Sequence, residues 1–323
     1  MTPRIAVLDD YQGAASTLHC WQRLDGRAEV HFFRDAAAGD EELADRLRGF
    51  PIIVPIRERT KFSAALLRRL PDLRFLALTG RNSGHVDVAA ATACGILVAE
   101  TESSGASPFE LTIALMLALA RQIPQEDRAM REGKWLTTIG VELAGKTLGI
   151  LGLGRLGAQV AGAARLFNMR LLAAGLTLTD ERAAAAGAAR VTVDELFRES
   201  DLLCIHLRLS DRTRGFVTAR HLALMKPTAY LINTARGPLV DEAALVDALR
   251  GRRIAGAALD VFETEPLPAG HPLRSLDNVV LSAHLGYVTS ESYQLFFTQA
   301  VENIVRYLHG EAPLRTLNAE VLA

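Results

Sequence analysis

Three charged side chains each follow a predicted strand in the second half of the chain. Arg236 comes after residues 230–233, Glu265 after 255–259 and His284 after 279–282. An arginine is a permanent planar cation that suits a carboxylate and a polarised carbonyl oxygen. A histidine exchanges a proton near neutral pH, and a carboxylate at its other ring nitrogen orients it. Together these residues predict proton transfer on a bound 2-keto acid or 2-hydroxy acid.

Each of these residues also has an ordinary structural explanation. Arg236 alone is equally typical of a surface helix cap, His284 of a core or loop histidine, and Glu265 before Pro266 of a solvated loop. Ligands of open parallel sheets bind beyond the carboxyl ends of the strands. The placement of all three residues after strands of one sheet therefore favours a reactive site.

A glycine motif supplies the second half of this prediction. Gly152-Leu153-Gly154-Arg155-Leu156-Gly157 follows the apolar run 147–151 and precedes the alanine-rich helical pattern 158–167. A strand, a tight glycine turn and a helix N-terminus form a cradle for a pyrophosphate. A plain strand-to-helix turn is the alternative. The context predicts a dinucleotide site, which would bring a nicotinamide to the three charged residues.

Alternating strand-like and helical segments predict the elements that position these residues. Eleven strands are expected, at 5–8, 30–33, 52–54, 75–79, 96–99, 148–151, 170–174, 202–206, 230–233, 255–259 and 279–282. Five precede a long helix at 108–122 and six follow it, which predicts an α/β protein with two parallel sheets. Residues 183–189 are expected to be an exposed helix end, and a final helix is expected near 291–309.

Composition excludes several classes of protein. The 323 residues are 49% hydrophobic, and 36 basic against 37 acidic residues give a net charge of -1. No basic tract stands out, so neither nucleic acid nor a membrane surface is an expected partner. Cys20, Cys94 and Cys204 lack metal-ligand spacing, so no metal is expected. The sparse cysteines, with no signal peptide, predict a cytoplasmic location. The apolar run 111–120 is too short to span a membrane and is expected to be a buried helix.

Four segments carry a resemblance to a known family. They are GKTLGILGLGRLG (145–157), MKPTAYLINTARGPLVD (225–241), ALDVFETEPL (258–267) and SAHLG (282–286). With these segments the chain resembles the D-isomer-specific 2-hydroxyacid dehydrogenases, which include D-3-phosphoglycerate dehydrogenases and glyoxylate/hydroxypyruvate reductases. The resemblance implies two Rossmann-like, doubly wound parallel-sheet domains with a cleft between them. Residues 1–102 plus 290–323 would form the substrate domain and 103–289 the dinucleotide domain.

The resemblance also implies roles for individual residues. Arg236 would bind the substrate carboxylate and carbonyl, with His284 as the acid/base and Glu265 as its partner. A further set would contact NAD or NADP: Gly152, Gly154, Arg155, Leu156, Gly157, Gly175, His206, Thr234 and Asp260, the last at the nicotinamide carboxamide. Arg57, Arg81, Asn82 and Ser83 would contact the substrate. The resemblance further implies a homodimer formed through the cofactor domains.

Three departures from the family pattern qualify these expectations. The chain ends at 323, so the C-terminal regulatory domain of some phosphoglycerate dehydrogenases is expected to be absent. The glycine pattern is altered around 81–83, which puts substrate contacts there in doubt. NAD-preferring members place an acidic residue near Gly175, where it binds the adenosine ribose hydroxyls. The missing carboxylate removes repulsion against a 2′-phosphate, although no arginine follows at once and Arg182 is the nearest. We expect relaxed cofactor specificity that leans to NADP.

The substrate and one rival function stay open from the sequence. Arg57 and Arg59 either meet an anionic substrate tail or belong to a solvated turn. Tyr11, Trp135 and Tyr287 either line an apolar pocket or belong to the core or an interface. The expected function is an NAD(P)-dependent oxidoreductase acting on a 2-keto acid or D-2-hydroxy acid. The alternative is a dinucleotide-sensing binding protein similar to the corepressors of this fold.

Overall fold

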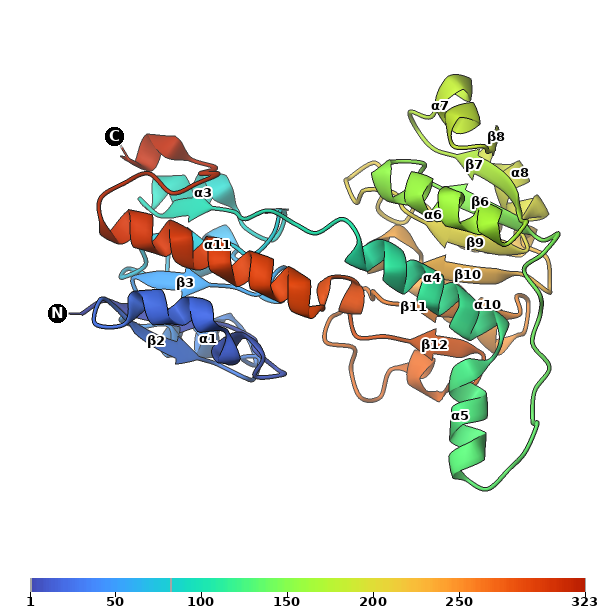
Figure 1. Cartoon of the computed structure of the whole chain (residues 1–323), viewed down its shortest axis with the longest axis horizontal. Helices are drawn as coiled ribbons and strands as arrows, with labels where there is room; N and C mark the ends of the chain where they lie inside the picture. The colour runs from blue at the N-terminus through green and yellow to red at the C-terminus, as the bar shows by residue number, and fades with distance from the viewer. Residues whose placement is uncertain (1, 82, 323) are drawn as a thin grey trace. The chain divides into compact units, whose positions relative to one another are not determined.

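The chain forms two compact units, each built around its own parallel sheet. The structure, a computed structural model, describes residues 2–81 and 83–322. Unit 1 consists of Met1–Ser104 and Thr289–Ala323, and unit 2 of Gly105–Val288. Figure 1 shows the elements of both units. No helix within 2–81 and 83–322 is sufficiently long and apolar to cross a membrane.

Unit 1 contains a five-stranded sheet with the order β2-β1-β3-β4-β5, in which every pairing is parallel. Its strands are β1 (Arg4–Val7), β2 (Glu29–Phe32), β3 (Ile52–Val54), β4 (Phe75–Ala77) and β5 (Leu97–Ala99). Its helices are α1 (Asp40–Arg46), α2 (Ala64–Leu67), α3 (Val88–Ala93) and α11 (Ser290–Leu308). Phe296 and Phe297 of α11 are buried, and Tyr307 stacks on Phe75 of β4 at 4.9 Å. The final helix therefore completes the core of the first sheet.

Unit 2 contains a seven-stranded sheet with the order β12-β11-β10-β9-β6-β7-β8, again with parallel pairings throughout. Its strands are β6 (Thr147–Leu151), β7 (Arg170–Ala174), β8 (Ala189–Arg190), β9 (Leu202–Ile205), β10 (Tyr230–Asn233), β11 (Gly256–Leu259) and β12 (Val279–Leu281). Its helices are α4 (Ser107–Ala120), α5 (Ile123–Arg131), α6 (Arg155–Leu166), α7 (Asp180–Ala185), α8 (Val193–Glu199), α9 (Ala219–Leu224) and α10 (Glu242–Arg250).

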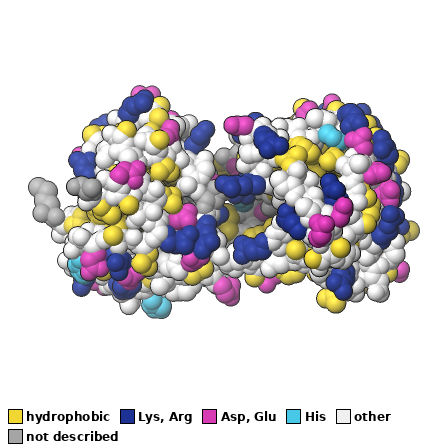
Figure 2. All heavy atoms as spheres, turned by 90° about the horizontal axis from the view of Figure 1, so that it is seen from above, with side chains coloured by type: hydrophobic (Ala, Val, Ile, Leu, Met, Phe, Trp, Pro, Cys, Tyr) yellow, Lys and Arg dark blue, Asp and Glu magenta, His cyan; other side chains and the backbone are white. Residues whose placement is uncertain are grey.

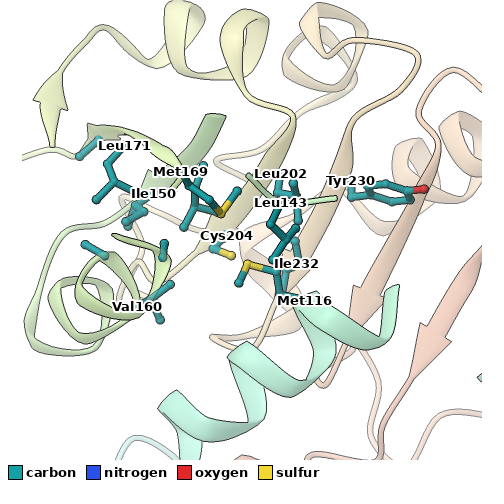
Figure 3. Packing of buried hydrophobic residues seen from close by; sticks show 14 of the residues in the cluster. Met116, Leu143, Ile150, Val160, Met169, Leu171, Leu202, Cys204, Tyr230 and Ile232 are labelled. Atoms are coloured by element: carbon teal, nitrogen blue, oxygen red, sulfur yellow. The ribbon is translucent and has the colours of Figure 1, made fainter. Parts of the chain in front are cut away.

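Both faces of the unit 2 sheet are buried, as a parallel sheet requires. On one face Met116 of α4 packs with Cys204 of β9 and Ile232 of β10 (Figure 3). On the other face Phe197 of α8 and Leu245 of α10 join the neighbouring strand residues. The predicted buried helix at 111–120 is thus confirmed as part of α4, whose Leu119 and Ala120 are also buried. On the surface, both basic and acidic side chains occur over the face shown in Figure 2.

The predicted α/β class with two parallel sheets is confirmed. The eleven predicted strands are all present, with ends shifted by no more than two residues. The expected division into five and six strands is wrong, because unit 2 has a seventh strand, β8. The interpretation of 183–189 as an exposed helix end is right only in part: Ala184, Ala185 and Ala189 are exposed, but the helix does not extend over the whole stretch. The helix α7 ends at Ala185, Ala183 and Ala188 are buried, and Ala189 begins β8.

Register brings the chemically interesting residues of unit 2 to one edge of the sheet. Leu151 pairs with both Ala174 and Ile205, and Asn233 pairs with Ile205 and Leu259. The loops that follow these strands therefore start side by side. The strand order reverses between β6 and β9, which is the topological switch point where open parallel sheets bind ligands.

Candidate active site

The glycine loop after β6 is shaped by steric necessity at two of its three glycines. Gly152 has φ +102°, and a Cβ there would lie 2.7 Å from the carbonyl carbon of His206. A Cβ on Gly157 would lie 2.6 Å from the carbonyl oxygen of Gly152. A Cβ on Gly154, in contrast, would meet no described atom within 4 Å. The first glycine thus fits the turn, the third fits the helix against the strand, and the second leaves open space in front of the loop.

The helix that follows this open space presents its N-terminus to the same edge. Gly154, the residue before α6, has an extended conformation, and no side chain caps the first turn. The first N–H groups of a helix, including those of Arg155 and Leu156, carry a partial positive charge and bind anions well. The loop and the helix together fit a pyrophosphate group.

His206 provides an independent indication of a ligand at this edge. It follows β9, and both of its ring nitrogens are buried without a partner among the residues that the structure describes. Burial lowers the pKa of His206 to about 4, so the ring is neutral at physiological pH. A neutral imidazole has one donor and one acceptor to satisfy. Two orphaned polar atoms beside the glycine loop therefore fit a polar ligand such as a dinucleotide.

The loop after β7 lacks the carboxylate typical of NAD-preferring sites. Gly175 occupies that position, and a Cβ there would meet Leu178 Cβ at 3.6 Å and Gly152 Cα at 3.8 Å, which are ordinary contacts. Arg182 of α7 donates hydrogen bonds to the carbonyl oxygens of Thr177 and Leu153, each at 3.1 Å. The guanidinium thus joins the loop after β7 to the glycine loop and brings positive charge to this part of the edge.

Asn233, the last residue of β10, shapes the loop that carries Arg236. Its Oδ1 accepts a hydrogen bond from the Ala235 N–H, and its Nδ2 donates to the Arg236 carbonyl oxygen, both at 3.0 Å. The hydroxyl groups of Thr234 and of Thr112 in α4 form a 2.8 Å hydrogen bond with each other. A Cβ on Gly237 would overlap the carbonyl group of Phe262, so this loop packs directly on the backbone of the loop after β11.

His284 and Glu265 form a hydrogen-bonded pair. The distance between His284 Nδ1 and Glu265 Oε2 is 2.6 Å, and both side chains are partly exposed. The other carboxylate oxygen, Oε1, accepts a 2.9 Å hydrogen bond from the Phe262 N–H, which fixes the carboxylate. With an ionised Glu265 as acceptor, the proton lies on Nδ1 and Nε2 is available to another molecule. This is the arrangement of a general acid/base with an orienting carboxylate.

Asp260, the residue after β11, is buried and accepts three hydrogen bonds from the segment that carries His284. Its Oδ1 accepts from Ser282 Oγ at 2.6 Å and the Leu285 N–H at 2.7 Å, and its Oδ2 from the Gly286 N–H at 3.0 Å. Burial raises the pKa of Asp260, while the hydrogen bond from Ser282 acts in the opposite direction. These bonds were not predicted from the sequence, although both Asp260 and Ser282 directly follow the ends of strands.

Two of the candidate substrate residues of unit 1, Arg57 and Arg81, are linked by a hydrogen bond. Arg57, at φ +54°, donates through Nη1 to the carbonyl oxygens of Thr79 and Arg81, at 3.1 and 3.0 Å. Arg81 forms an ion pair with Glu102 at 2.5 Å. The carbonyl oxygen of Ser83 accepts a 2.8 Å hydrogen bond from the Val86 N–H. Asn82 lies outside the described residues. Arg57 thus holds the loop at 79–81, and a contact from this loop to a substrate stays a prediction.

Comparison with known proteins places the chain in a family. Residues 113–286 match the family model described as "D-isomer specific 2-hydroxyacid dehydrogenase, NAD binding domain", which covers most of unit 2. The chain belongs to the D-isomer-specific 2-hydroxyacid dehydrogenase family. It is therefore an oxidoreductase with a nicotinamide-dinucleotide domain, in accord with the cradle and the orphaned His206.

Curated relatives and a solved structure support this membership. A glyoxylate reductase from Aeropyrum pernix is 42% identical over 267 residues, which are 80% of each chain. A D-3-phosphoglycerate dehydrogenase from Methanocaldococcus jannaschii is 38% identical over 282 residues, which are 86% of this chain and 53% of the relative. The chain thus spans about half the length of the second relative. A phosphoglycerate oxidoreductase structure from Vibrio cholerae matches with a TM-score of 0.91 and 38% identity, covering 96% of this chain and 99% of that one.

Proposed function

We propose that this protein transfers a hydride between a nicotinamide dinucleotide and a small 2-keto acid or D-2-hydroxy acid. The observation that carries the proposal is the 2.6 Å pair of His284 and Glu265 on the same sheet edge as the Arg236 loop and the glycine cradle. The relatives named glyoxylate reductase and D-3-phosphoglycerate dehydrogenase support this substrate class.

Arg236 is the proposed substrate-binding cation. Its guanidinium offers paired N–H donors in one plane, which match a carboxylate and the neighbouring carbonyl oxygen of a 2-keto acid. Asn233 binds the Ala235 N–H and the Arg236 carbonyl oxygen, and so fixes the backbone from which the Arg236 side chain extends. Substrate binding to a permanent cation also polarises the carbonyl group toward reaction.

His284 is the proposed acid/base and Glu265 its positioning partner. During reduction the carbonyl oxygen gains negative charge, and the imidazole donates a proton to it from Nε2; in the reverse direction Nε2 accepts that proton. Glu265 holds the proton on Nδ1 throughout and keeps the ring oriented. The bound dinucleotide supplies or accepts the hydride.

The proposed cofactor site consists of the glycine loop and the residues beside it. Backbone N–H groups of Arg155 and Leu156 hold the pyrophosphate, with Gly152, Gly154 and Gly157 making the close approach possible. His206 and Thr234, which follow β9 and β10, are proposed to meet the remainder of the dinucleotide. The buried ring of His206 supports this role, because a ligand would satisfy its nitrogens.

We propose relaxed cofactor specificity that leans to NADP. Gly175 removes the repulsion that a carboxylate would exert on a 2′-phosphate, and Arg182 adds a cation held near Thr177. Steady-state kinetics with both cofactors tests this preference. A kcat/KM for NADH about a hundredfold above that for NADPH would contradict it.

We also propose a homodimer formed through the cofactor domains. The α5 arm, defined as residues 123–139, comprises α5 and the loop after it, which stands away from the sheet of unit 2 (Figure 1). It carries five exposed large hydrophobic side chains: Ile123, Met130, Trp135, Leu136 and Ile139, the last 96% exposed. Apolar side chains gathered in this way are typical of protein interfaces.

The function is tested by turnover of glyoxylate, hydroxypyruvate and bulkier 2-keto acids with both reduced cofactors. Replacement of His284 by alanine is expected to lower kcat by about 10²–10⁴-fold, the usual contribution of a general acid. His19→Ala, at an exposed position in unit 1, is the matched control. A wild-type kcat in His284→Ala would reject the assigned role. A wild-type protein that turns over none of these acids would favour the dinucleotide-sensing alternative.

A further inference from the structure

His284 has a backbone conformation that is uncommon for residues other than glycine. Its φ and ψ are +54° and +49°, in the left-handed region. A residue with a Cβ is disfavoured there, because the Cβ comes close to its own backbone. Such a conformation persists only where surrounding contacts impose it. The contacts that impose it here must therefore act on the backbone next to His284.

Asp260 makes those contacts on both sides of the histidine. Its carboxylate accepts hydrogen bonds from Ser282, two residues before His284, and from the N–H groups of Leu285 and Gly286, which follow it. The main chain adds another bond, because the His284 N–H donates to the Asp260 carbonyl oxygen at 2.9 Å. A single buried residue thus holds the turn before, at and after the histidine.

We infer that Asp260, supported by Ser282, is a positioning residue that sets the conformation of the His284 loop and so aims the imidazole at Glu265 and the substrate. This inference rests on the proposed role of His284. In this geometry two carboxylates position the imidazole in different ways. Glu265 orients the ring directly through Nδ1, whereas Asp260 acts through the backbone from which the ring extends.

The hydrogen-bond donors around Asp260 suit a carboxylate that positions the His284 loop. An ionised carboxylate only accepts hydrogen bonds, and three donors converge on this one. Burial is the strongest influence and raises the pKa of Asp260, while these bonds and the His284 side chain act in the opposite direction. An asparagine in its place would present an NH₂ group to at least one of these N–H or O–H donors. A carboxylate is therefore better suited to the position than its neutral isostere.

The family resemblance assigns Asp260 to the nicotinamide carboxamide, and the two roles predict different results. A carboxylate has about four acceptor positions, so three bonds within the loop leave room for one ligand contact. A residue that acts only on the cofactor affects dinucleotide binding. A residue that positions His284 affects the chemical step and the environment of the imidazole.

The experiment measures three properties of Asp260→Asn, Ser282→Ala and Ser282→Thr. They are the low-field ¹H resonance of the His284 Nδ1–H group in ¹⁵N-histidine-labelled protein, the dissociation constants of NADH and NADPH, and kcat and KM with glyoxylate. The resonance is assigned by its loss in His284→Ala. It requires no turnover, so a failure of the proposed function appears separately, as an intact resonance in a wild-type protein that reduces no 2-keto acid.

We expect Asp260→Asn to lose or shift this resonance and to lower kcat on the order of 10²-fold, the effect of misplacing a catalytic group by about 1 Å. Cofactor dissociation constants and KM are expected to stay near wild type. Ser282→Ala is expected to change in the same direction by less, and Ser282→Thr, which keeps the hydroxyl, to restore the wild-type values.

A different pattern would overturn the inference. If Asp260→Asn weakens dinucleotide binding while the His284 resonance and kcat at saturating cofactor stay as in wild type, Asp260 acts on the cofactor alone. If Asp260→Asn does not fold, the comparison of Ser282→Ala with Ser282→Thr tests the positioning role. Equal kcat values and equal resonances in Ser282→Ala and Ser282→Thr would then refute the positioning role.

Discussion

Replacing Gly175 with aspartate is expected to change the cofactor preference without distorting the site. A Cβ at Gly175 would lie 3.6 Å from Leu178 Cβ and 3.8 Å from Gly152 Cα, both ordinary van der Waals distances. The position does not have a positive φ, so a side chain brings no backbone strain. The effect of the substitution should therefore come from its charge.

The size of the change in cofactor preference has two contributions. One is charge repulsion against NADPH, and the other is hydrogen bonding to NADH. At about 5 Å in water, a carboxylate and a doubly charged 2′-phosphate repel each other by roughly 2 kcal/mol, with a larger value at lower dielectric constant. The water value suits this loop, where Leu176 is 48% exposed. It corresponds to a loss of about 30-fold for NADPH. Hydrogen bonds from the ribose hydroxyls to the new carboxylate add about 1.5–3 kcal/mol for NADH.

The assay is the ratio of kcat/KM for NADH to that for NADPH at a fixed 2-keto acid concentration. We expect Gly175→Asp to raise this ratio by about 400- to 5,000-fold, from the two contributions together. Gly175→Asn is the matched control, since it has the same shape and no charge. An equal loss with both cofactors, or an equal shift of the ratio in Gly175→Asn, would refute the electrostatic reasoning.

Two further predictions concern stability and assembly. Burial lowers the pKa of His206 to about 4 from 6.5, so the folded protein binds fewer protons between these values and loses stability as the pH falls through them. In urea unfolding, the free energy of unfolding of the wild type should fall by about 3 kcal/mol between pH 6.5 and about 4, and this fall should be absent from His206→Gln. Equal pH dependence of the unfolding free energy in the two proteins would contradict this prediction. In sedimentation equilibrium, Ile139→Asp in the α5 arm should convert a wild-type dimer to monomers. The control Leu166→Asp, at an exposed leucine of α6, should not. A monomeric wild type would reject the proposed dimer.

Strand positions were predictable because the strands of a buried parallel sheet are apolar along their whole length. The central strands are continuous apolar runs, such as Leu202–Ile205, which is buried along its whole length. The edge strand β8 has only two residues, Ala189 and Arg190, both exposed, and gives no such signal. Its pairing with β7 depends on the tertiary position of the chain after α7, which periodicity does not encode.

The residue types of the candidate site were also predictable, but their internal support was not. Arg236, Glu265 and His284 follow strand ends, and parallel strands end at one edge of a sheet. The bonds that Asp260 accepts from Ser282 and Leu285 depend on the pairing of β11 with β12, in which Leu259 lies opposite Leu281. The left-handed conformation of His284 is held by these contacts, which depend on the tertiary fold.

The contact at Gly237 has a consequence for redesigning the substrate range of this protein. Because a methyl group at residue 237 would overlap the carbonyl of Phe262, the loop with Arg236 and the loop with Glu265 fit each other as one piece. Grafting either loop alone from a homologue would require the other to change in the same step. Directed evolution that mutates single positions should therefore leave both loops intact, and recombination libraries should place their crossovers outside residues 233–266.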